Sequence, residues 1–273
     1  MTTFKEYSFQ DHTDVYLIID SIMESFGYKY YLIGANARDI QLYKAGIKPS
    51  RGTADVDFAV MIPSLEDYAK FIAKIINNGF KETKHKYRVI YVESNTVVDI
   101  LPYGEIAQDY TLNFDERDIE LSVLGFEEVG TEIEHFKING NLSIPTTSAH
   151  GLIILKLISW NDRNDRNKDL KDIRSLLDAG WELYQDEIYD QNLIHFDLLN
   201  VEDFDIHNAA ARVMGRKIKP LLDKCGPLKE TIMSLLQKEV NSPEKITIEM
   251  SKDDDTAKVI LLLSNLLQGI NDN

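Results

Sequence analysis

Apolar and polar positions in the first part of the chain alternate between helical and strand-like spacing. From residue 14 to residue 26, apolar side chains recur at intervals of three and four positions, which predicts an amphipathic helix. The stretch "YKYYLIG" (28–34) is rich in strand-forming residues and ends at a glycine. "ANARDIQLYKAG" (35–46) then predicts a helix that ends at Gly46.

The next part of the chain predicts further strands and one more helix. Ser64 is a suitable N-cap for a helix whose apolar side runs over residues 65–76. "YRVIYVE" (87–93) and "TVVDIL" (96–101) predict two strands that "SN" joins in a hairpin. Within "FKINGNLSIP", Asn139-Gly140 suggests another tight turn.

After Pro145 the pattern becomes helical. Residues 146–180 predict helix with one polar interruption, and three later segments also predict helices: 203–214, 227–239 and 254–269. We therefore expect an α+β fold, with a mixed domain over residues 1–145 and an α-helical domain over residues 146–273.

The predicted strand within "RGTADVDFAV" (51–60) contains two carboxylates. Side chains alternate along a strand, so Asp55 and Asp57 project to one face while Val56 and Phe58 project to the other. Aspartate is unfavourable in strands, and burying it without a partner costs several kcal/mol, roughly. Either this face is exposed to solvent, or a divalent cation lies between the carboxylates, since hard oxygen ligands suit Mg²⁺.

A third carboxylate, Asp99, stands in the apolar run "NTVVDILPYG" (95–104). It is either a structural side chain, hydrogen-bonded or solvent-facing near Pro102, or a further metal ligand. If its strand lies next to the strand of Asp55, three carboxylates converge. Such a set serves two-metal phosphoryl transfer, in which one ion activates the attacking oxygen and the other holds the leaving phosphates.

The sequence "LIGANARDI" (32–40) places Gly34 between a strand and a helix. A glycine there allows backbone N–H groups to approach a phosphate, and the helix N-terminus carries partial positive charge. Glycine often serves only to turn the chain. This junction indicates a phosphate site mainly because it lies one helix ahead of the Asp pair.

Composition narrows the range of functions. The chain of 273 residues carries 45 acidic and 30 basic side chains, a net charge of −15, which argues against a broad nucleic-acid platform but allows a local basic groove. The single cysteine, Cys225, cannot form an internal disulfide, and the six histidines lack the spacing of a zinc site. The N-terminal stretch has no basic start or apolar core, and the apolar runs are shorter than the ~20 residues of a membrane span, so we expect a cytoplasmic protein without membrane contact.

Together, Gly34-Ala35, the Asp55-Val56-Asp57-Phe58 strand and Asp99 resemble the signature of the DNA polymerase β-type nucleotidyltransferase superfamily. "RGTADVDFAV" and the downstream "LKLISWNDRNDRNKDLKDI" resemble the AbiEii/AbiGii type of toxin-like nucleotidyltransferases, and "GANARD" is similar to a turn of tRNA CCA-adding enzymes. The resemblance spans roughly residues 28 to 178. It implies a nucleotidyltransferase-fold mixed β-sheet flanked by helices, followed by the helical domain.

The resemblance also implies roles for individual residues. Asp55 and Asp57 would bind Mg²⁺, with two ions present when a nucleoside triphosphate is bound. Asp99 would complete the metal site and help to deprotonate the acceptor hydroxyl. Gly34 and the backbone of Ala35 would hold the β- and γ-phosphates. The other residues implied to contact the nucleotide are Arg38, Arg51, Thr53 and Lys156, although Lys156 is equally well explained as a snorkelling lysine on an amphipathic helix.

The leading hypothesis is a Mg²⁺-dependent enzyme that moves a nucleoside monophosphate from a nucleoside triphosphate to an acceptor hydroxyl, on tRNA or on a small molecule. The alternative is a catalytically weak or inactive protein of this fold that acts as a toxin–antitoxin or regulatory binding module. It is favoured by Ala35, which replaces the usual Gly or Ser, and by the long interval to Asp55. A DxD glycosyltransferase would leave Asp99 and the Gly34 turn unexplained.

The charged segment "NDRNDRNKDLKD" (161–172) has the spacing of ion pairs on an exposed helix. We expect a solvated, ion-paired surface there. The functional interpretation makes it the rim of a nucleotide or nucleic-acid cleft.

Overall fold

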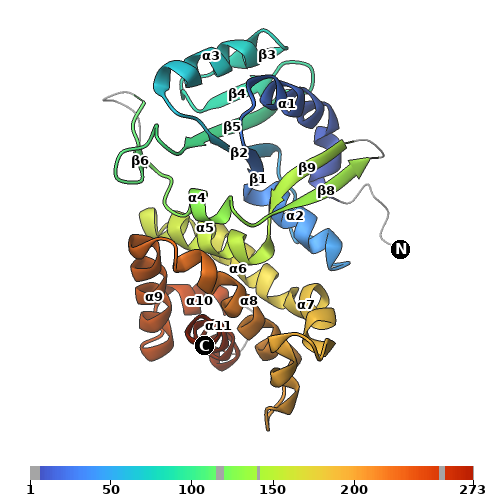
Figure 1. The fold of residues 1–273 in the computed structure, drawn as a ribbon, viewed down its shortest axis with the longest axis vertical. Helices are drawn as coiled ribbons and strands as arrows, with labels where there is room; N and C mark the ends of the chain where they lie inside the picture. The colour runs from blue at the N-terminus through green and yellow to red at the C-terminus, as the bar shows by residue number, and fades with distance from the viewer. Residues whose placement is uncertain (1–6, 115–119, 140–141, 252–255, 273) are drawn as a thin grey trace. The chain divides into compact units, whose positions relative to one another are not determined.

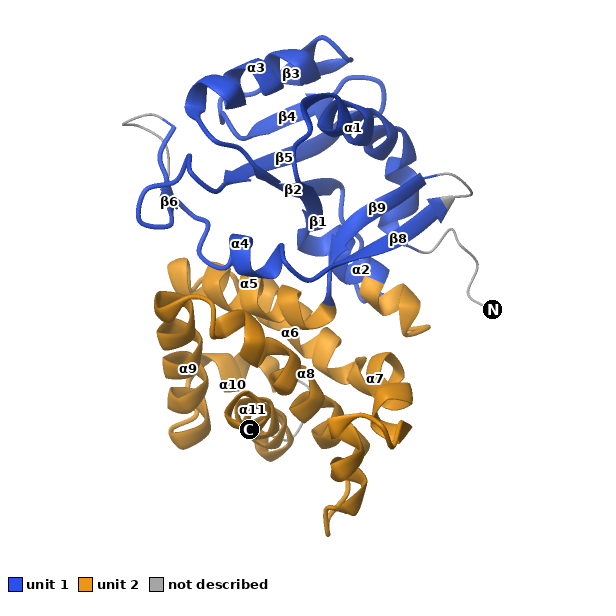
Figure 2. Ribbon diagram, in the orientation of Figure 1, with its two compact units in different colours: residues 1–40, 48–148 blue, residues 41–47, 149–273 orange. Residues whose placement is uncertain are grey.

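The computed structural model describes residues 7–114, 120–139, 142–251 and 256–272 (Figure 1). The chain forms two compact units: a sheet unit of residues 1–40 and 48–148, and a helical unit of residues 41–47 and 149–273 (Figure 2). The sequence predicted a boundary near residue 145. Nothing in its pattern indicated that residues 41–47 group with the C-terminal part.

The sheet unit is built on a mixed sheet whose described strands follow the order β3-β4-β5-β2-β1-β9-β8. Their bounds are β1 Tyr30–Ile33, β2 Asp55–Met61, β3 Phe80–Glu82, β4 Arg88–Tyr91, β5 Thr96–Tyr103, β8 Ile133–Asn139 and β9 Leu142–Thr147. A separate two-stranded ribbon consists of β6 (Thr111–Leu112) and β7 (Leu121–Ser122).

Strands β2 and β5 are parallel neighbours in the middle of the sheet, and β1 pairs with β2 in the antiparallel direction. The predicted hairpin is confirmed, because β4 and β5 pair antiparallel with Tyr91 opposite Thr96, but the turn spans residues 92–95 rather than the two residues Ser94 and Asn95. At the other side of the sheet, β1 pairs with β9 in parallel, and β9 pairs with β8 antiparallel. The tight turn predicted at Asn139-Gly140 lies partly outside the described residues.

The helices of this unit lie between the strands in sequence. They are η2 Ser8–His12, α1 Thr13–Phe26, α2 Gly34–Lys44, α3 Leu65–Ile76 and the single turn α4 Phe126–Val129. The predicted N-cap of α3 is confirmed: Ser64 Oγ accepts a hydrogen bond from the backbone N–H of Asp67 at 3.1 Å. Helix α2 begins directly after β1 and runs past residue 40 into the segment assigned to the helical unit.

Helices α1 and α3 pack on the apolar face of the sheet. Tyr16 of α1 meets Phe58 of β2 edge-on, with 6.2 Å between ring centroids. The hydroxyl of Tyr68 in α3 donates a hydrogen bond to the carbonyl oxygen of Ile100 in β5 at 3.0 Å. Phe58 and Ile100 are fully buried. The face of β2 that carries Asp55 and Asp57 is therefore the opposite one.

The helical unit contains the helices that the sequence pattern predicted after Pro145. The helices predicted at 203–214, 227–239 and 254–269 each extend beyond their predicted C-terminal ends, and residues 254–255 lie outside the described residues. Its elements are α5 Ala149–Asp162, α6 Asn167–Asp178, α7 Gly180–Tyr189, η3 Ile194–Asn200, α8 Ile206–Leu222, α9 Gly226–Asn241, α10 Lys245–Met250 and α11 Thr256–Asn271. Among the described residues, no helix combines the length and the apolar character that crossing a membrane requires.

Helices α8 and α11 cross with their backbones in contact. A Cβ atom on Gly215 would lie 2.1 Å from the carbonyl oxygen of Leu266, and one on Gly269 would lie 2.1 Å from that of Arg212. Arg212 also donates to both carboxylate oxygens of Asp272, just beyond α11, at 2.9 Å. Glycine at both crossing positions is what allows this close approach.

The charged segment 161–172 is divided by the break between α5 and α6. The expectation of a solvated surface is wrong for two of its carboxylates, because Asp169 and Asp172 are only 3% and 2% exposed. The amphipathic period of α6 turns both toward the interior together with Leu170 and Ile173.

Substitution of Leu32 tests the packing of the sheet core next to the predicted site. Leu32 is fully buried in β1, where it pairs with Phe58 of β2 and Thr146 of β9. We expect Leu32→Ala to lower the free energy of unfolding by about 2–5 kcal/mol, because it leaves a cavity in a packed sheet. The control Leu17→Ala, at a position 48% exposed in α1, is expected to change it by less than about 0.5 kcal/mol. Urea denaturation followed by circular dichroism measures both, and equal losses would contradict this packing.

Candidate active site

The three predicted carboxylates share one face of the sheet. Asp57 of β2 pairs directly with Asp99 of the parallel strand β5, and paired residues project to the same side. Asp55 stands two residues before Asp57 on β2 and therefore projects with it. These side chains are part of a row across neighbouring strands. On one side Ile33, the last residue of β1, pairs with Asp57, and on the other side Arg88 of β4 pairs with Asp99.

Asp57 packs against the glycine that begins α2. Gly34 has φ +69°, a left-handed backbone conformation that residues other than glycine rarely adopt. A Cβ atom on Gly34 would lie 2.1 Å from Asp57 Oδ2 and 2.8 Å from Asp57 Cγ. The carboxylate thus occupies the space that a side chain at residue 34 would fill. Its negative charge lies at a helix N-terminus, where the helix dipole favours it.

Asp55 is fixed through its backbone. The side-chain amide of Asn36, in the first turn of α2, donates to the carbonyl oxygen of Asp55 at 2.6 Å. Thr53 Oγ1 accepts from the Asp55 N–H at 3.3 Å. Burial lowers the pKa of nearby His12, although the Thr53 backbone and the charges of Asp11 and Asp55 act in the opposite direction. Burial therefore disfavours a positive charge on His12 beside Asp55.

Asp99 is paired with Arg88, a residue that the sequence analysis did not assign to the site. Arg88 Nε donates to Asp99 Oδ1 at 2.6 Å, and Arg88 Nη2 donates to Asp99 Oδ2 at 2.7 Å. These hydrogen bonds, with the charges of Asp99 and Asp55, raise the pKa of Arg88 above its usual value. The predicted two-residue turn at Ser94-Asn95 would place Ile90 opposite Asp99. The observed turn spans residues 92–95, which shifts the register by two positions and brings Arg88 opposite Asp99, so the predicted turn did not indicate this pair.

The remaining residues around the α2 turn are engaged within the protein. Arg38 is 2% exposed, and its guanidinium forms an ion pair with the neighbouring Asp39, with Nε 2.8 Å from Asp39 Oδ1. It also donates to the carbonyl oxygen of Arg51 at 3.0 Å. The N–H of Thr53 donates to Ser8 Oγ at 3.0 Å. The structure thus gives Arg38 a buried structural partner, and nucleotide contacts by Arg38, Arg51, Thr53 and Ala35 stay predictions.

Lys156 belongs to the helical unit, where it lies on α5. It is 6% exposed, and its Nζ donates to Asp172 Oδ2 at 2.6 Å and to Asp169 Oδ1 at 3.4 Å. Ser159 Oγ also donates to Asp169, at 3.1 Å. The ammonium group is therefore held by two buried carboxylates of α6. Its predicted contact with the triphosphate stays a prediction.

The donors on the sheet face are of the right chemistry for magnesium. Asp55 and Asp57 offer carboxylate oxygens from adjacent positions on one face, as a hard divalent cation requires. Among the described residues, however, no group of three or more His, Cys, Asp and Glu side chains is arranged to hold a metal ion. The residues therefore fit a cation held by Asp55 and Asp57, with Asp99 directed to Arg88.

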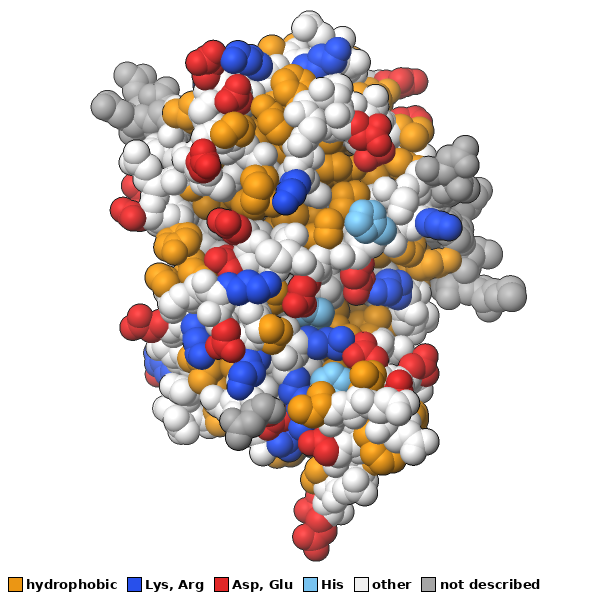
Figure 3. All heavy atoms as spheres, viewed as in Figure 1, with side chains coloured by type: hydrophobic (Ala, Val, Ile, Leu, Met, Phe, Trp, Pro, Cys, Tyr) orange, Lys and Arg blue, Asp and Glu red, His pale blue; other side chains and the backbone are white. Residues whose placement is uncertain are grey.

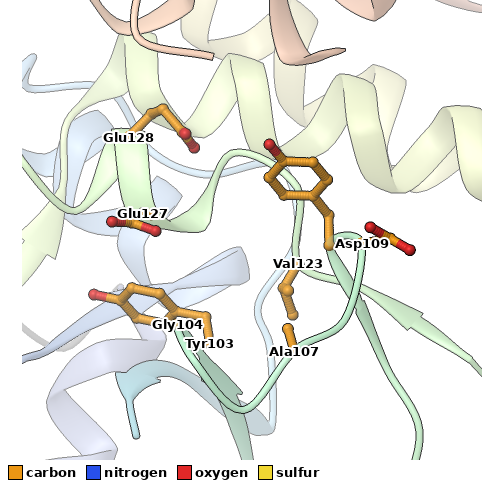
Figure 4. A pocket seen from close by; sticks show the side chains of 8 residues that line it. Tyr103, Gly104, Ala107, Asp109, Val123, Glu127 and Glu128 are labelled. Carbon is orange, nitrogen blue, oxygen red and sulfur yellow. The ribbon is translucent and has the colours of Figure 1, made fainter. Parts of the chain in front are cut away.

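A pocket of about 240 Å³ lies beyond the end of β5 (Figure 4). Tyr103, the last residue of β5, forms part of its wall, and three carboxylates also line it: Asp109, Glu127 and Glu128. None of the predicted site residues is in this lining. Because like charges repel, an acidic lining does not suit the phosphates of a nucleotide.

The mixed sheet, with a glycine turn before an acid–apolar–acid strand, has the arrangement that the resemblance to nucleotidyltransferases implies. A model of the family described as "Nucleotidyl transferase AbiEii toxin, Type IV TA system" matches residues 26–249, and the chain belongs to this family. The predicted family, the α+β fold class and the assignment as a nucleotidyltransferase are thereby confirmed.

Two solved structures are similar to the chain. One is an antigenic nucleotidyltransferase-like protein from Paracoccidioides brasiliensis, with 16% sequence identity and a TM-score of 0.43, covering 82% of this chain and 93% of that one. The other is the antibiotic-resistance factor ANT(2'')-Ia, with 11% identity and a TM-score of 0.35, covering 68% of this chain and 97% of that one. A comparison with curated protein sequences finds no match.

Gly34→Ala tests the contact between Gly34 and Asp57. The added Cβ would meet the Asp57 carboxylate at 2.1 Å, in addition to the strain of a left-handed alanine. We expect a loss of unfolding free energy that exceeds that of Gly27→Ala by about 1–3 kcal/mol, because Gly27 has φ +68° and open space around it. Adding Asp57→Ala to Gly34→Ala should recover part of the excess. Equal losses for the two glycines, measured by chemical denaturation, would show that the carboxylate does not pack there.

Proposed function

We propose that this protein is a Mg²⁺-dependent nucleotidyltransferase that moves a nucleoside monophosphate from a nucleoside triphosphate to an acceptor hydroxyl. The observation that carries the proposal is the placement of Asp55 and Asp57 on the sheet face that meets the N-terminus of α2 at Gly34. Carboxylates for a cation and a helix N-terminus for phosphates are then next to each other.

The reaction joins the acceptor oxygen to the α-phosphorus and breaks the bond between that phosphorus and the oxygen that bridges to the β-phosphate. Pyrophosphate leaves, and the hydroxyl proton passes to a base or to water. A bound magnesium ion would supply charge neutralisation and orient the phosphates. Asp55 and Asp57 would hold it, while the backbone at Gly34 and Ala35 would bind the β- and γ-phosphates. Catalysis by such a site consists mainly of positioning and electrostatic stabilisation.

Electrostatics explains why this site requires a cation. A phosphate at the N-terminus of α2 would approach the Asp57 carboxylate, which already lies against Gly34. Two unit negative charges 4 Å apart repel by about 4 kcal/mol at an effective dielectric constant of 20. Triphosphate binding is therefore unfavourable until a positive charge lies between the two groups. This argument supports Mg²⁺ dependence.

Arg51, Thr53 and Lys156 remain proposed nucleotide contacts. The Thr53 hydroxyl is already next to the Asp55 backbone, at 3.3 Å, so its proposed role requires no large movement. Lys156 is the weaker proposal, because Asp172 and Asp169 already compensate its charge.

The proposed acceptor is a hydroxyl of tRNA or of a small molecule. On the face shown in Figure 3, the described Lys and Arg side chains are interspersed with Asp and Glu in both units, and they form no continuous basic track there. A regulatory or toxin–antitoxin role without strong catalysis is the second candidate, favoured by Ala35 in the place of the family's usual Gly or Ser. Since the reaction consumes a nucleoside triphosphate, the proposed location is the cytoplasm.

Transfer of label from each of the four nucleoside triphosphates tests the proposal. With label on the α-phosphate, we expect Mg²⁺-dependent incorporation into tRNA or a small-molecule acceptor, whereas label on the γ-phosphate should leave with pyrophosphate. Asp57→Asn should lower the rate by about 10²-fold or more, because it removes a carboxylate that holds the cation.

The control is Asp14→Asn, which changes an exposed carboxylate of α1. It should leave the rate unchanged. Transfer of the γ-label, or full activity of Asp57→Asn, would contradict the proposal. Metal-dependent nucleotide binding without turnover would favour the regulatory candidate.

A further inference from the structure

The pairing of Arg88 with Asp99 removes the third carboxylate from the set that is open to a metal ion. Both Asp99 oxygens accept hydrogen bonds from one guanidinium, at 2.6 and 2.7 Å. Hydrogen bonds between charged groups in this forked geometry are about twice as strong as hydrogen bonds between neutral groups. The Asp99 side chain is 11% exposed, so water offers it little alternative solvation.

The pair is a consequence of strand register rather than of a flexible surface contact. Arg88 begins β4, and the antiparallel pairing of β4 with β5 places it opposite Asp99. The carbonyl oxygen of Tyr87 accepts a hydrogen bond from the N–H of Ile100 at 2.7 Å, which holds the two strands together next to the pair. The guanidinium is therefore delivered to this position by the hairpin itself.

Arg88 also keeps a side that faces solvent. Its side chain is 33% exposed, and Nη1 makes no hydrogen bond to any residue that the structure describes. Asp55, on the same face, contributes to the electrostatic environment of this guanidinium. The Arg88 guanidinium is thus held by Asp99, lies near Asp55 and is partly open to solvent. A positively charged group in such a position can bind an anion.

The charge on this face is consistent with one metal ion. The three carboxylates carry three negative charges, and Arg88 supplies one positive charge. A single divalent cation then brings the face to neutrality before the nucleotide binds. A second divalent cation at Asp99 would lie beside the guanidinium and be repelled by it.

We propose that Arg88, positioned by Asp99, contacts the phosphates of the nucleotide in the place of a second metal ion, so that the site uses one divalent cation held by Asp55 and Asp57. The inference rests on the proposed nucleotidyltransferase function and assigns two roles within it. Arg88 stabilises negative charge on the transferred phosphoryl group or on the leaving pyrophosphate. Asp99 is a positioning residue for Arg88 rather than a metal ligand or a base.

The number of bound ions distinguishes this arrangement from a two-metal centre. Mn²⁺ binding is followed by electron paramagnetic resonance, in the presence of an α,β-methylene nucleoside triphosphate that cannot undergo transfer. We expect one Mn²⁺ per chain in the wild type, none in Asp57→Asn and still one in Asp99→Asn. Two ions in the wild type, of which Asp99→Asn loses one, would overturn the proposal. Mn²⁺ binding that Asp57→Asn leaves unchanged would instead refute the proposed active site itself.

Nucleotide affinity and turnover test the role of Arg88. We expect Arg88→Gln to weaken binding of the triphosphate analogue by roughly 10- to 100-fold, the loss of a hydrogen bond to a charged group. Arg88→Lys should lose less, since it keeps the charge but not the fork. Lys84→Gln, which removes an exposed positive charge in the loop between β3 and β4, is the matched control and should bind as the wild type does. Equal affinity of Arg88→Gln and wild type would overturn the role of Arg88.

Folding of the variants is checked by circular dichroism. If Asp99→Asn does not fold because Arg88 is left without its partner, the double variant Asp99→Asn/Arg88→Gln removes both charges and takes its place in the Mn²⁺ titration. The expected count is again one ion. A count of zero would show that Asp99 belongs to the metal site and would overturn the proposal.

Discussion

The in-register, parallel pairing of β2 with β5 places Asp57 beside Asp99, and the position of Asp99 and Arg88 in the proposed site depends on that alignment. Because side chains alternate along a strand, a slip of one residue would move Asp99 to the face covered by α1 and α3. The buried side chains Val56, Phe58 and Ile100 make such a slip costly, since it would expose them. The apolar face thus fixes the position of the polar one.

Clustered carboxylates in the middle of a sheet are tolerated because each has a specific environment. Asp57 lies at the N-terminus of α2, where glycine leaves room for it. Asp99 is held by Arg88, and Asp55 begins its strand at the edge of the row. Residual negative charge remains on the face after these contacts. That charge favours the binding of a cation on this face, and the binding of a nucleotide then depends on the cation.

Local signals in the sequence predicted much of this arrangement. The strand of Asp55, the Gly34 turn, the Ser64 cap and the hairpin that carries Asp99 each follow from spacing and turn chemistry, which are short-range properties. The partners of charged groups depend on register and packing between distant segments. The pairs Arg88–Asp99 and Lys156–Asp172 were therefore not predicted, and neither was the burial of Asp169. The grouping of residues 41–47 with the helical unit likewise has no local signature.

The most direct test of the account is a crystal structure with Mn²⁺ and an α,β-methylene nucleoside triphosphate, in which anomalous scattering locates the metal. The account predicts a metal peak in direct contact with oxygens of both Asp55 and Asp57, with the triphosphate at the N-terminus of α2. A triphosphate bound elsewhere, or a metal peak that contacts neither carboxylate, would contradict it.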